Sequence, residues 1–250
     1  MLTAEQIAHF HTQGYLVIPA MVDPVYCRTV IAFAQHALNE AAEPIEYEAD
    51  THYPGAPNSR EAEGGQTARR ILQAAARSPL LMNWARDFQL KKILQQFLGD
   101  SVYLSQAHHN CIMTKQPRFS SRTGWHRDSR YWNFKQPELV SVWLALGREA
   151  PENGCLKVLP GSHLWLINSN QLDSDQFLRT DSPENETLLE QAITIELHAG
   201  DVLFFHSNLF HEAGNNQTSQ TKYSLVFTYR AADNPPLAGS RSASFEEIAM

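Results

Sequence analysis

From about residue 100 onward, the sequence consists of short β-rich runs separated by turn residues. No helix-length segment regularly separates these runs, which argues against a parallel βαβ sheet. Several short strands with turn signals between them are typical of a β-sandwich or a β-barrel. Residues 100–230 are therefore expected to form a core that is mainly β. The predicted strands are Val102–Ile112, Val140–Leu146, Leu156–Leu159, Ile193–Leu197, Val202–Phe205 and Tyr223–Tyr229.

The first 99 residues carry helix signals and are expected to pack against this core. Thr3-Ala4-Glu5-Gln6 has the form of a capping box. Asp23-Pro24 has the form of an N-cap followed by proline at the first helical position. The predicted elements are a helix from Thr3 to Gly14, a strand over Tyr15–Ile18, a helix from Asp23 to about Ala42 and a helical stretch from Ser78 to Gly99.

Three polar segments interrupt or follow these elements. Residues 43–68 are acidic and rich in Pro and Gly, and they are too long for a simple connector, so they are expected to form a mobile loop that acts as a lid. Residues 162–192 are expected to be an insertion between strands. Residues 231–250 are expected to be a loosely held tail. The chain is thus predicted to be a single domain over residues 1–250, with a helical part (1–99), a β core (100–230) and this tail.

The composition excludes several classes of protein. Among 250 residues, 43% are hydrophobic and 19% are charged, which argues against disorder for most of the chain. The sequence contains no run of 18 apolar residues, so no transmembrane helix is expected. A net charge of −7 argues against nucleic acid as a partner. The three cysteines form no CxxC pair, which argues against a disulfide scaffold and a thiolate zinc site. With no signal peptide at the start, a cytoplasmic location is expected.

The segment Gly124-Trp125-His126-Arg127-Asp128 holds the first candidate metal ligands. In an extended segment, residues i and i+2 point to the same side, so His126 and Asp128 can aim at one point. His211 follows an apolar strand and is a candidate third ligand. Two histidines and one carboxylate on one face leave open coordination positions, as in the facial triad of non-haem Fe(II) oxygenases. By spacing alone, a surface histidine beside a turn aspartate is the commoner explanation of such a pair.

The flanking sequence adds two more motifs in a fixed order. Pro151-Glu152-Asn153-Gly154-Cys155-Leu156 leads to Pro160-Gly161-Ser162-His163, and Gly200-Asp201-Val202-Leu203-Phe204-Phe205-His206 precedes His211. With these motifs, residues 105–230 resemble the phytanoyl-CoA dioxygenase (PhyH) family of Fe(II)- and 2-oxoglutarate-dependent oxygenases. The resemblance implies a double-stranded β-helix (jelly-roll) core with helices outside. It also implies iron at His126, Asp128 and His211.

The same resemblance implies an enzyme that hydroxylates a small molecule with O₂ while 2-oxoglutarate is decarboxylated to succinate and CO₂. In the family, an arginine about eleven residues after the distal histidine binds the far carboxylate of 2-oxoglutarate. Lys222 stands there, and it offers a point charge instead of a planar fork. Arg230 lies about 26 Å further along the strand, too far for the same pocket. Further co-substrate contacts implied by the resemblance are Trp143, Cys111, Asn110 and Arg70.

Substrate contacts are expected from the segment after the metal-binding pair, which contains Arg130 and Trp132. Arg118, Arg122 and Arg130 bracket that pair and suit an anionic substrate, although solvated basic loops are the commoner role for single arginines. His108 and His109 are adjacent, so only one of them is expected to face the cavity. His163 and His206 are expected to be structural.

Two alternatives stay open at this stage, together with the substrate and the oligomeric state. The first is a non-catalytic ligand-binding protein on the same jelly-roll, since fold does not fix function. The intact set of His126, Asp128 and His211 argues against it. The second is a cupin-like metalloenzyme that does not use 2-oxoglutarate. The presence of Asp128 favours hydroxylation or desaturation over halogenation, because related halogenases lack this carboxylate.

Overall fold

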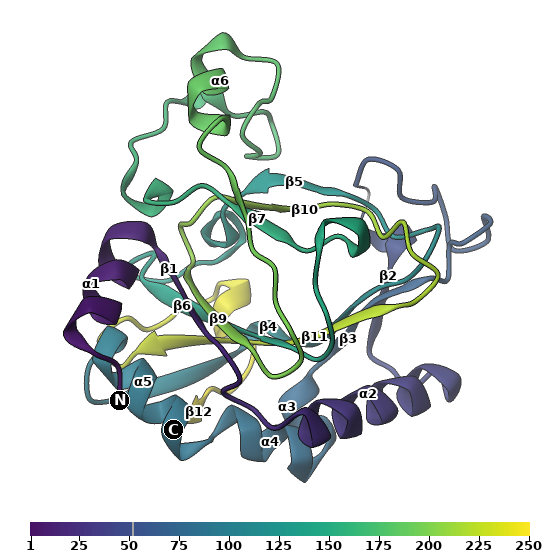
Figure 1. Ribbon diagram of the computed structural model, residues 1–250, viewed down its shortest axis with the longest axis horizontal. Coiled ribbons are helices and arrows are strands. Elements are labelled where there is room, and N and C mark those ends of the chain that lie inside the picture. Colours follow the sequence, from purple (N-terminus) through teal and green to yellow (C-terminus); the bar gives the residue numbers. More distant parts are fainter. Residues whose placement is uncertain (52) are drawn as a thin grey trace.

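The computed structural model describes residues 1–51 and 53–250, and its centre is a pair of facing antiparallel β-sheets (Figure 1). The larger sheet contains β1 (Tyr15–Ile18), β2 (Ile45–Tyr47), β3 (Ala68–Leu72), β4 (Val102–Lys115), β6 (Leu139–Ala145), β9 (Val202–His206), β11 (Lys222–Ala231) and β12 (Ile248–Ala249). Its order is β1-β9-β6-β11-β4-β3-β2, and β12 pairs with β4. The smaller sheet, in the order β5-β10-β7-β8, contains β5 (Thr123–His126), β7 (Leu156–Val158), β8 (Ile193–Thr194) and β10 (His211–Ala213). The predicted mainly-β core is confirmed.

Helices cover the outer face of the larger sheet (Figure 1). These helices are α1 (Ala4–Gln13), α2 (Pro24–Asn39), α3 (Ala74–Arg77), α4 (Pro79–Ala85) and α5 (Phe88–Leu98). A further helix, α6 (Pro183–Leu189), lies away from the larger sheet, beyond β5 and β7 (Figure 1). Val30 of α2, Leu81 of α4 and Leu94 of α5 are fully buried in one apolar cluster with Leu104 and Phe204 of the sheet. Each such side chain contributes about 1.5–3 kcal/mol by leaving water. This layer of helices therefore holds the larger sheet in place on its outer face.

A second apolar layer lies between the two sheets. It includes Trp143, Leu156, Leu203, Phe205 and Val226, which come from both sheets. Period-two alternation explains the two layers, since neighbouring residues of one strand point to opposite faces. Along β11, for example, Leu225 and Phe227 join the helix-side cluster while Val226 faces the other sheet. A ligand-binding site between the sheets is therefore expected where polar side chains replace the apolar ones of this layer.

The sequence signals at the N-terminus are confirmed. The Thr3 side chain accepts a hydrogen bond from the Gln6 backbone, and Gly14 ends α1 in the left-handed conformation. The stretch from Ser78 to Gly99 was expected to be one helical stretch, but it contains the two helices α4 and α5. The Asp87 carboxylate accepts hydrogen bonds from the amides of Gln89 and Leu90, and this N-cap starts a new helix.

The expected loop over residues 43–68 is wrong near its start, whereas residues 53–67 contain neither helix nor strand, as expected. β2 begins at Ile45 and pairs with β3, which extends the larger sheet. Glu48, in the short 3₁₀ helix Glu48–Asp50, is completely buried and pairs with Arg69. The polar composition of this segment suggested an exposed loop, because charged residues are usually exposed. Here two of them form a buried ion pair instead. Position 52 of that segment lies outside the described residues.

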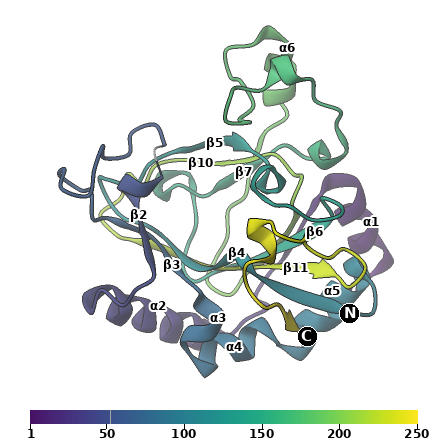
Figure 2. The same cartoon turned by 180° about the vertical axis from the view of Figure 1, so that it is seen from behind.

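The expected loose tail is also wrong, since residues 241–250 are held against the larger sheet (Figure 2). Ile248 pairs with Leu104 of β4. The guanidinium of Arg230 donates to Glu247 at 2.8 Å, and Ser242 is buried. These contacts connect positions more than a hundred residues apart, which a local reading of Pro and Gly content does not detect.

The turn at Gly154 supports the space between the sheets, and it gives a first prediction. Gly154 has φ of 75°, and an added Cβ would lie 2.4 Å from the Gly214 carbonyl oxygen and 2.9 Å from Lys115 Cδ. Gly239 also has φ of 75°, but its added Cβ would meet nothing within 4 Å. Gly154→Ala is therefore expected to lose about 1–3 kcal/mol more unfolding free energy than Gly239→Ala in urea titrations. Equal losses would contradict the close packing of this turn.

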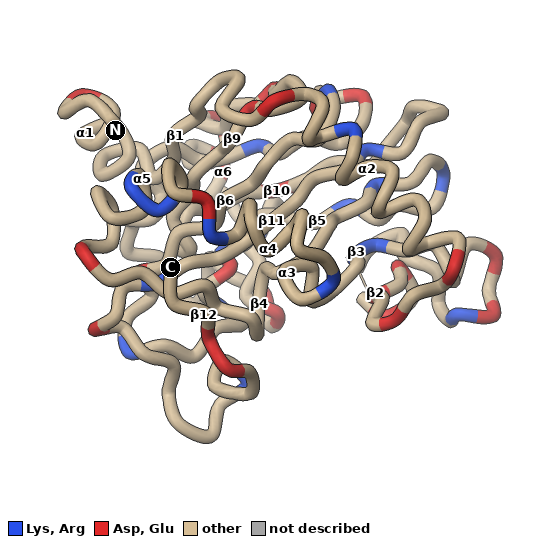
Figure 3. Tube along the Cα trace, turned by 90° about the horizontal axis from the view of Figure 1, so that it is seen from below, with Lys and Arg blue, Asp and Glu red and all other residues tan. Residues whose placement is uncertain are grey.

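In Figure 3, Lys and Arg positions are interspersed with Asp and Glu positions. Within the described part of the chain, none of the helices combines the length and hydropathy needed to cross a bilayer.

Candidate active site

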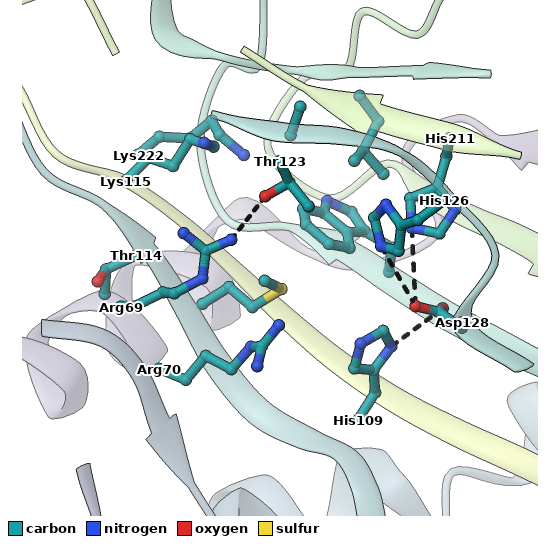
Figure 4. Close-up of a pocket in the computed structure, with 14 residues that line it drawn as sticks. Arg69, Arg70, His109, Thr114, Lys115, Thr123, His126, Asp128, His211 and Lys222 are labelled. Carbon is teal, nitrogen blue, oxygen red and sulfur yellow. Dashed lines mark hydrogen bonds and ion pairs between the residues drawn. The ribbon is translucent and has the colours of Figure 1, made fainter. Parts of the chain in front are cut away.

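Three buried side chains meet at one end of the space between the sheets. His126 ends β5 and His211 begins β10, and the antiparallel register makes them direct cross-strand partners. Asp128 begins the 3₁₀ helix Asp128–Tyr131 that follows β5. Its Oδ1 lies 3.8 Å from His126 Nε2 and 3.7 Å from His211 Nε2 (Figure 4). One ligand atom from each residue lies within 4.8 Å of the others.

Backbone hydrogen bonds orient both imidazole rings. His126 Nδ1 lies 2.8 Å from the Gly124 carbonyl oxygen, and His211 Nδ1 lies 3.0 Å from that of Leu209. Each Nδ1 therefore carries the hydrogen, and each Nε2 presents its lone pair toward Asp128. Burial, together with His211, lowers the pKa of His126 well below its usual value, so its ring is neutral. Neutral imidazole is the form that binds metals.

The donor set fits a divalent iron. Among the described residues, Asp128 Oδ2 is buried without a hydrogen-bond partner, and His109 Nδ1 lies 3.4 Å from it. An unpartnered buried carboxylate oxygen is costly unless a cation completes its surroundings. Two imidazole nitrogens and one carboxylate on a single face match the facial triad of non-haem iron, which leaves positions open for other ligands.

A bulge in β4 brings both His108 and His109 close to the metal ligands, although only one of them was expected to face the cavity. Asn110 pairs with Phe227, whereas the next pair along the ladder joins Ser105 to Thr228, so residues 106–109 are extra on β4. The strict two-residue alternation fails across such a bulge. His109 consequently lies beside Asp128, and the ring of His108 stacks on Trp132 with centroids 5.0 Å apart.

An inner cavity runs from the metal ligands into the space between the sheets (Figure 4). Its far end from the metal ligands is basic. Figure 4 shows Arg69, Lys115, Thr123 and Lys222 at that end, and Trp143 also lines the cavity.

Lys222 and Trp143, both expected to contact 2-oxoglutarate, lie together in this inner cavity. Lys222 Nζ lies 3.0 Å from Glu149 Oε2 and 5.1 Å from the centre of the Trp143 ring. The indole Nε1 donates to Glu149 Oε1 at 3.0 Å. Glu149 is 1% exposed, so one buried carboxylate positions both side chains. Arg230 pairs with Glu247 instead and lines neither cavity described here, as its distance along the strand predicts.

A second cavity of about 350 Å³, called the outer cavity, adjoins the inner one at the metal ligands. Arg70, His109, His126 and Asp128 line both cavities, so the metal-binding residues stand at their junction. The Arg70 guanidinium donates to Glu46 at 2.8 Å. Aromatic side chains form much of the remaining wall: Tyr53, Tyr131, Trp132 and Phe245.

Comparison with known proteins decides the family. A sequence model of the phytanoyl-CoA dioxygenase (PhyH) family matches residues 10–224. The chain belongs to the phytanoyl-CoA dioxygenase family. It is therefore an Fe(II)- and 2-oxoglutarate-dependent dioxygenase, as the sequence motifs predicted, and neither alternative drawn from the sequence is favoured.

Two curated members of the family show how far the similarity extends. The chain is 30% identical to an ectoine dioxygenase of Sphingopyxis alaskensis, over 93% of this chain and 77% of that protein. It is 24% identical to the peroxisomal phytanoyl-CoA dioxygenase of Rattus norvegicus, over 93% of this chain and 70% of that one.

Solved structures confirm the double-stranded β-helix fold. EctD from S. alaskensis, solved with 2-oxoglutarate and 5-hydroxyectoine, superposes with a TM-score of 0.77 at 22% identity, over 94% of this chain and 78% of that one. The epimerase SnoN from nogalamycin biosynthesis, solved with Fe³⁺ and α-ketoglutarate, gives a TM-score of 0.74 at 20% identity, over 98% and 92% of the two chains.

The remaining candidate residues are distributed unevenly around the PhyH-type site. Asn110 and Cys111 line the outer cavity and not the inner one, whereas Arg70 lines both. Trp132 lines the outer cavity. Arg130 lies nearby with its guanidinium carbon 3.7 Å from the centre of the Phe177 ring, and it lines neither cavity.

Arg118 and Arg122 are not brought to the cavities. Arg118 is exposed and lies 3.8 Å from Glu63. Arg122 donates to Glu212 at 2.6 Å, and its side chain is 55% exposed. His163 and His206 lie away from the metal ligands, where His206 pairs with Glu138 at 2.9 Å. This position agrees with their expected structural role.

Sequence reasoning missed Lys115 and Arg69, and it did not decide which of His108 and His109 faces the cavity. Lys115 lies beyond the predicted strand, which ended at Ile112, whereas β4 continues to Lys115. Extending that strand would have given the signal, because Cys111, Met113 and Lys115 are spaced by two residues and would share a face. Arg69 had no such signal, since its strand β3 was not predicted. His109 depends on the bulge in β4, which only the pairing with β11 reveals.

Proposed function

We propose that this dioxygenase hydroxylates a small polar molecule held in the outer cavity, with 2-oxoglutarate held in the inner cavity. The observation that carries the proposal is that two adjoining cavities share His126 and Asp128, so two different ligands could reach one metal from them. Iron and 2-oxoglutarate, once bound, supply O₂ activation and the oxidative decarboxylation to succinate and CO₂.

In the inner cavity, the protein binds and orients the co-substrate. Lys222 supplies positive charge for the far carboxylate, and Trp143 forms a rigid wall beside it. The sheets on both sides bury this space, which strengthens the attraction between an ammonium group and a carboxylate. His126, Asp128 and His211 hold the metal at the opposite end.

In the outer cavity, the environment of Asn110 favours a substrate that carries a hydrogen-bond acceptor. Asn110 is 1% exposed, and its Oδ1 accepts a hydrogen bond from the Ala75 backbone at 2.8 Å. That bond fixes the amide orientation and leaves Nδ2 buried without a partner. Arg70 Nε, which is also buried, lacks a partner too. Two donors of this kind suit a carbonyl, hydroxyl or carboxylate oxygen of the substrate.

Succinate formation tests this function. Purified protein with Fe(II), O₂ and 2-oxoglutarate is incubated with small polar candidates that carry an acceptor oxygen, and succinate is measured beside the mass of the product. The expected result is succinate in equal amount to a product heavier by one oxygen atom. Iron binding without any succinate, across the whole set and in the absence of added substrate, would contradict the proposal.

A second prediction concerns Lys222. Lys222→Met removes a buried ammonium from the inner cavity, and losing such a charged contact costs about 2–5 kcal/mol. The KM for 2-oxoglutarate is expected to rise at least about thirtyfold. Lys92→Met, on the exposed side of α5, is the matched control and should leave the KM unchanged. An unchanged KM in Lys222→Met would move the carboxylate site elsewhere.

We also propose a reducing cytoplasm as the working location. Cys27, Cys111 and Cys155 are all buried free thiols. Burial raises the pKa of Cys111 to about 12, so this thiol beside the site stays protonated and unreactive.

A further inference from the structure

Two buried lysines stand directly opposite each other at the basic end of the inner cavity. Lys115 on β4 and Lys222 on β11 are cross-strand partners, and both line the cavity (Figure 4). They are 8% and 6% exposed. Like charges directly opposite on one face of a sheet destabilise it. Their position therefore requires compensation by negative charge.

The protein compensates only one of the two. Lys222 Nζ lies 3.0 Å from Glu149 Oε2. Lys115 Nζ instead donates to a neutral group, the Ser121 carbonyl oxygen, at 2.8 Å. Among the described residues, no carboxylate forms an ion pair with Lys115. The nearby third cation, Arg69, is already paired with Glu48.

A charge count over this end shows what is missing. With every group ionised, Lys115, Lys222 and Arg69 would carry three positive charges, against two negative charges on Glu48 and Glu149. Burial, with Arg69 and Lys222 close by, lowers the pKa of Lys115 well below its usual value. One additional carboxylate would balance the charges and give Lys115 its missing partner.

We propose that Lys115 and Lys222 together bind the far carboxylate of 2-oxoglutarate, with one ammonium group on each side of it. The inference rests on the proposed function and adds Lys115 to it. A single arginine offers two parallel N–H donors in one fork. Two lysines on adjacent strands supply the same two-point contact from separate side chains, which explains how this chain functions with lysine at position 222.

The arrangement predicts different roles for the two lysines. Lys222 keeps Glu149 as a partner whether or not the ligand is bound, whereas Lys115 gains its only anionic partner from the ligand. Lys115→Met therefore removes a buried amine whose charged form has no ion-pair partner among the described residues of the free protein. The free variant should unfold at the same temperature as the unmodified protein or at a higher one.

The test is ligand binding under anaerobic conditions, measured by calorimetry on protein loaded with Fe(II). The two probes are 2-oxoglutarate and 2-oxopentanoate, which keeps the 2-oxo acid group but lacks the far carboxylate. Lys115→Met is expected to weaken 2-oxoglutarate binding at least about thirtyfold. Its affinity for 2-oxopentanoate should stay within about twofold of the unmodified protein. Lys92→Met is the control for loss of a lysine elsewhere.

Each contrary outcome has a separate meaning. If the unmodified protein and Lys115→Met bind 2-oxoglutarate equally, the inference about Lys115 is overturned while the proposed function stands. If Lys115→Met weakens both probes equally, Lys115 supports the cavity without binding the carboxylate, and the inference is again overturned. If the unmodified protein does not bind 2-oxoglutarate at all, the proposed function fails and the inference fails with it.

Discussion

Asp128→Ala is expected to abolish succinate formation from 2-oxoglutarate. Asp128 supplies the only carboxylate of the three-residue ligand group, and its Oδ1 lies within 3.8 Å of both histidine Nε2 atoms. Loss of residues that merely orient metal ligands typically costs 10–100-fold in affinity or activity. Loss of a ligand itself should cost more, so turnover is expected to fall at least about a hundredfold.

The measurement combines turnover, Fe(II) affinity and thermal unfolding of the metal-free protein. Asp128 Oδ2 is buried without a hydrogen-bond partner. In the metal-free protein this unpartnered carboxylate oxygen destabilises the fold, and a bound iron ion would remove that cost. Removing the carboxylate should leave the unfolding temperature of the metal-free variant unchanged or higher. A variant that is folded, inactive and poor in iron therefore separates loss of metal from loss of structure.

Asp100→Asn is the matched control, because Asp100 is exposed and lies in the turn before β4. It should keep full turnover and full iron affinity. Full activity in Asp128→Ala would show that Asp128 is not a metal ligand, and it would contradict the assignment of the facial triad.

The metal ligands were predictable because their signals are local. His126 and Asp128 lie two residues apart on an extended segment, and His211 closely follows a clear apolar strand. The helix caps at Thr3 and Asp23 were predictable for the same reason. In each case the chemistry is contained within a few consecutive residues.

The rest of the site depends on contacts between distant segments. The pairing of Lys115 with Lys222 joins β4 to β11, and no local pattern states that register. His109 reaches Asp128 because of a bulge that becomes visible only against the partner strand. Arg118 and Arg122 show the reverse error: nearness in sequence to the metal ligands suggested a shared cavity, but their side chains turn outward.

The largest misjudgement from sequence concerned the segment that contains Glu48, and it leads to the largest expected effect on stability. Glu48 is completely buried and Arg69 is 3% exposed, with 3.1 Å between Glu48 Oε2 and Arg69 Nη1. The guanidinium also donates to Ser121 Oγ at 2.9 Å and to Thr123 Oγ1 at 2.6 Å. One charged pair thus joins β2 and β3 to the start of β5.

Arg69→Met is expected to lower the free energy of unfolding by about 3–5 kcal/mol, because it leaves the Glu48 carboxylate buried without its cation. For a chain of this size, that corresponds to a fall of roughly 6–20 °C in the unfolding temperature. Urea and thermal unfolding of the metal-free protein measure it. The matched control is Arg60→Met, which breaks the exposed ion pair between Arg60 and Asp50 and should have only a small effect.

A double variant shows whether the loss comes from the unpaired charge. Arg69→Met combined with Glu48→Gln removes both charges, so it should recover much of the stability that either change alone loses. The two single losses should therefore exceed the loss in the double variant when they are added together. If the losses simply add, or if Arg69→Met is no worse than Arg60→Met, then the pair does not anchor β2 and β3. Because β3 carries Arg70 into both cavities, the same anchoring determines whether the junction of the two ligand sites keeps its shape.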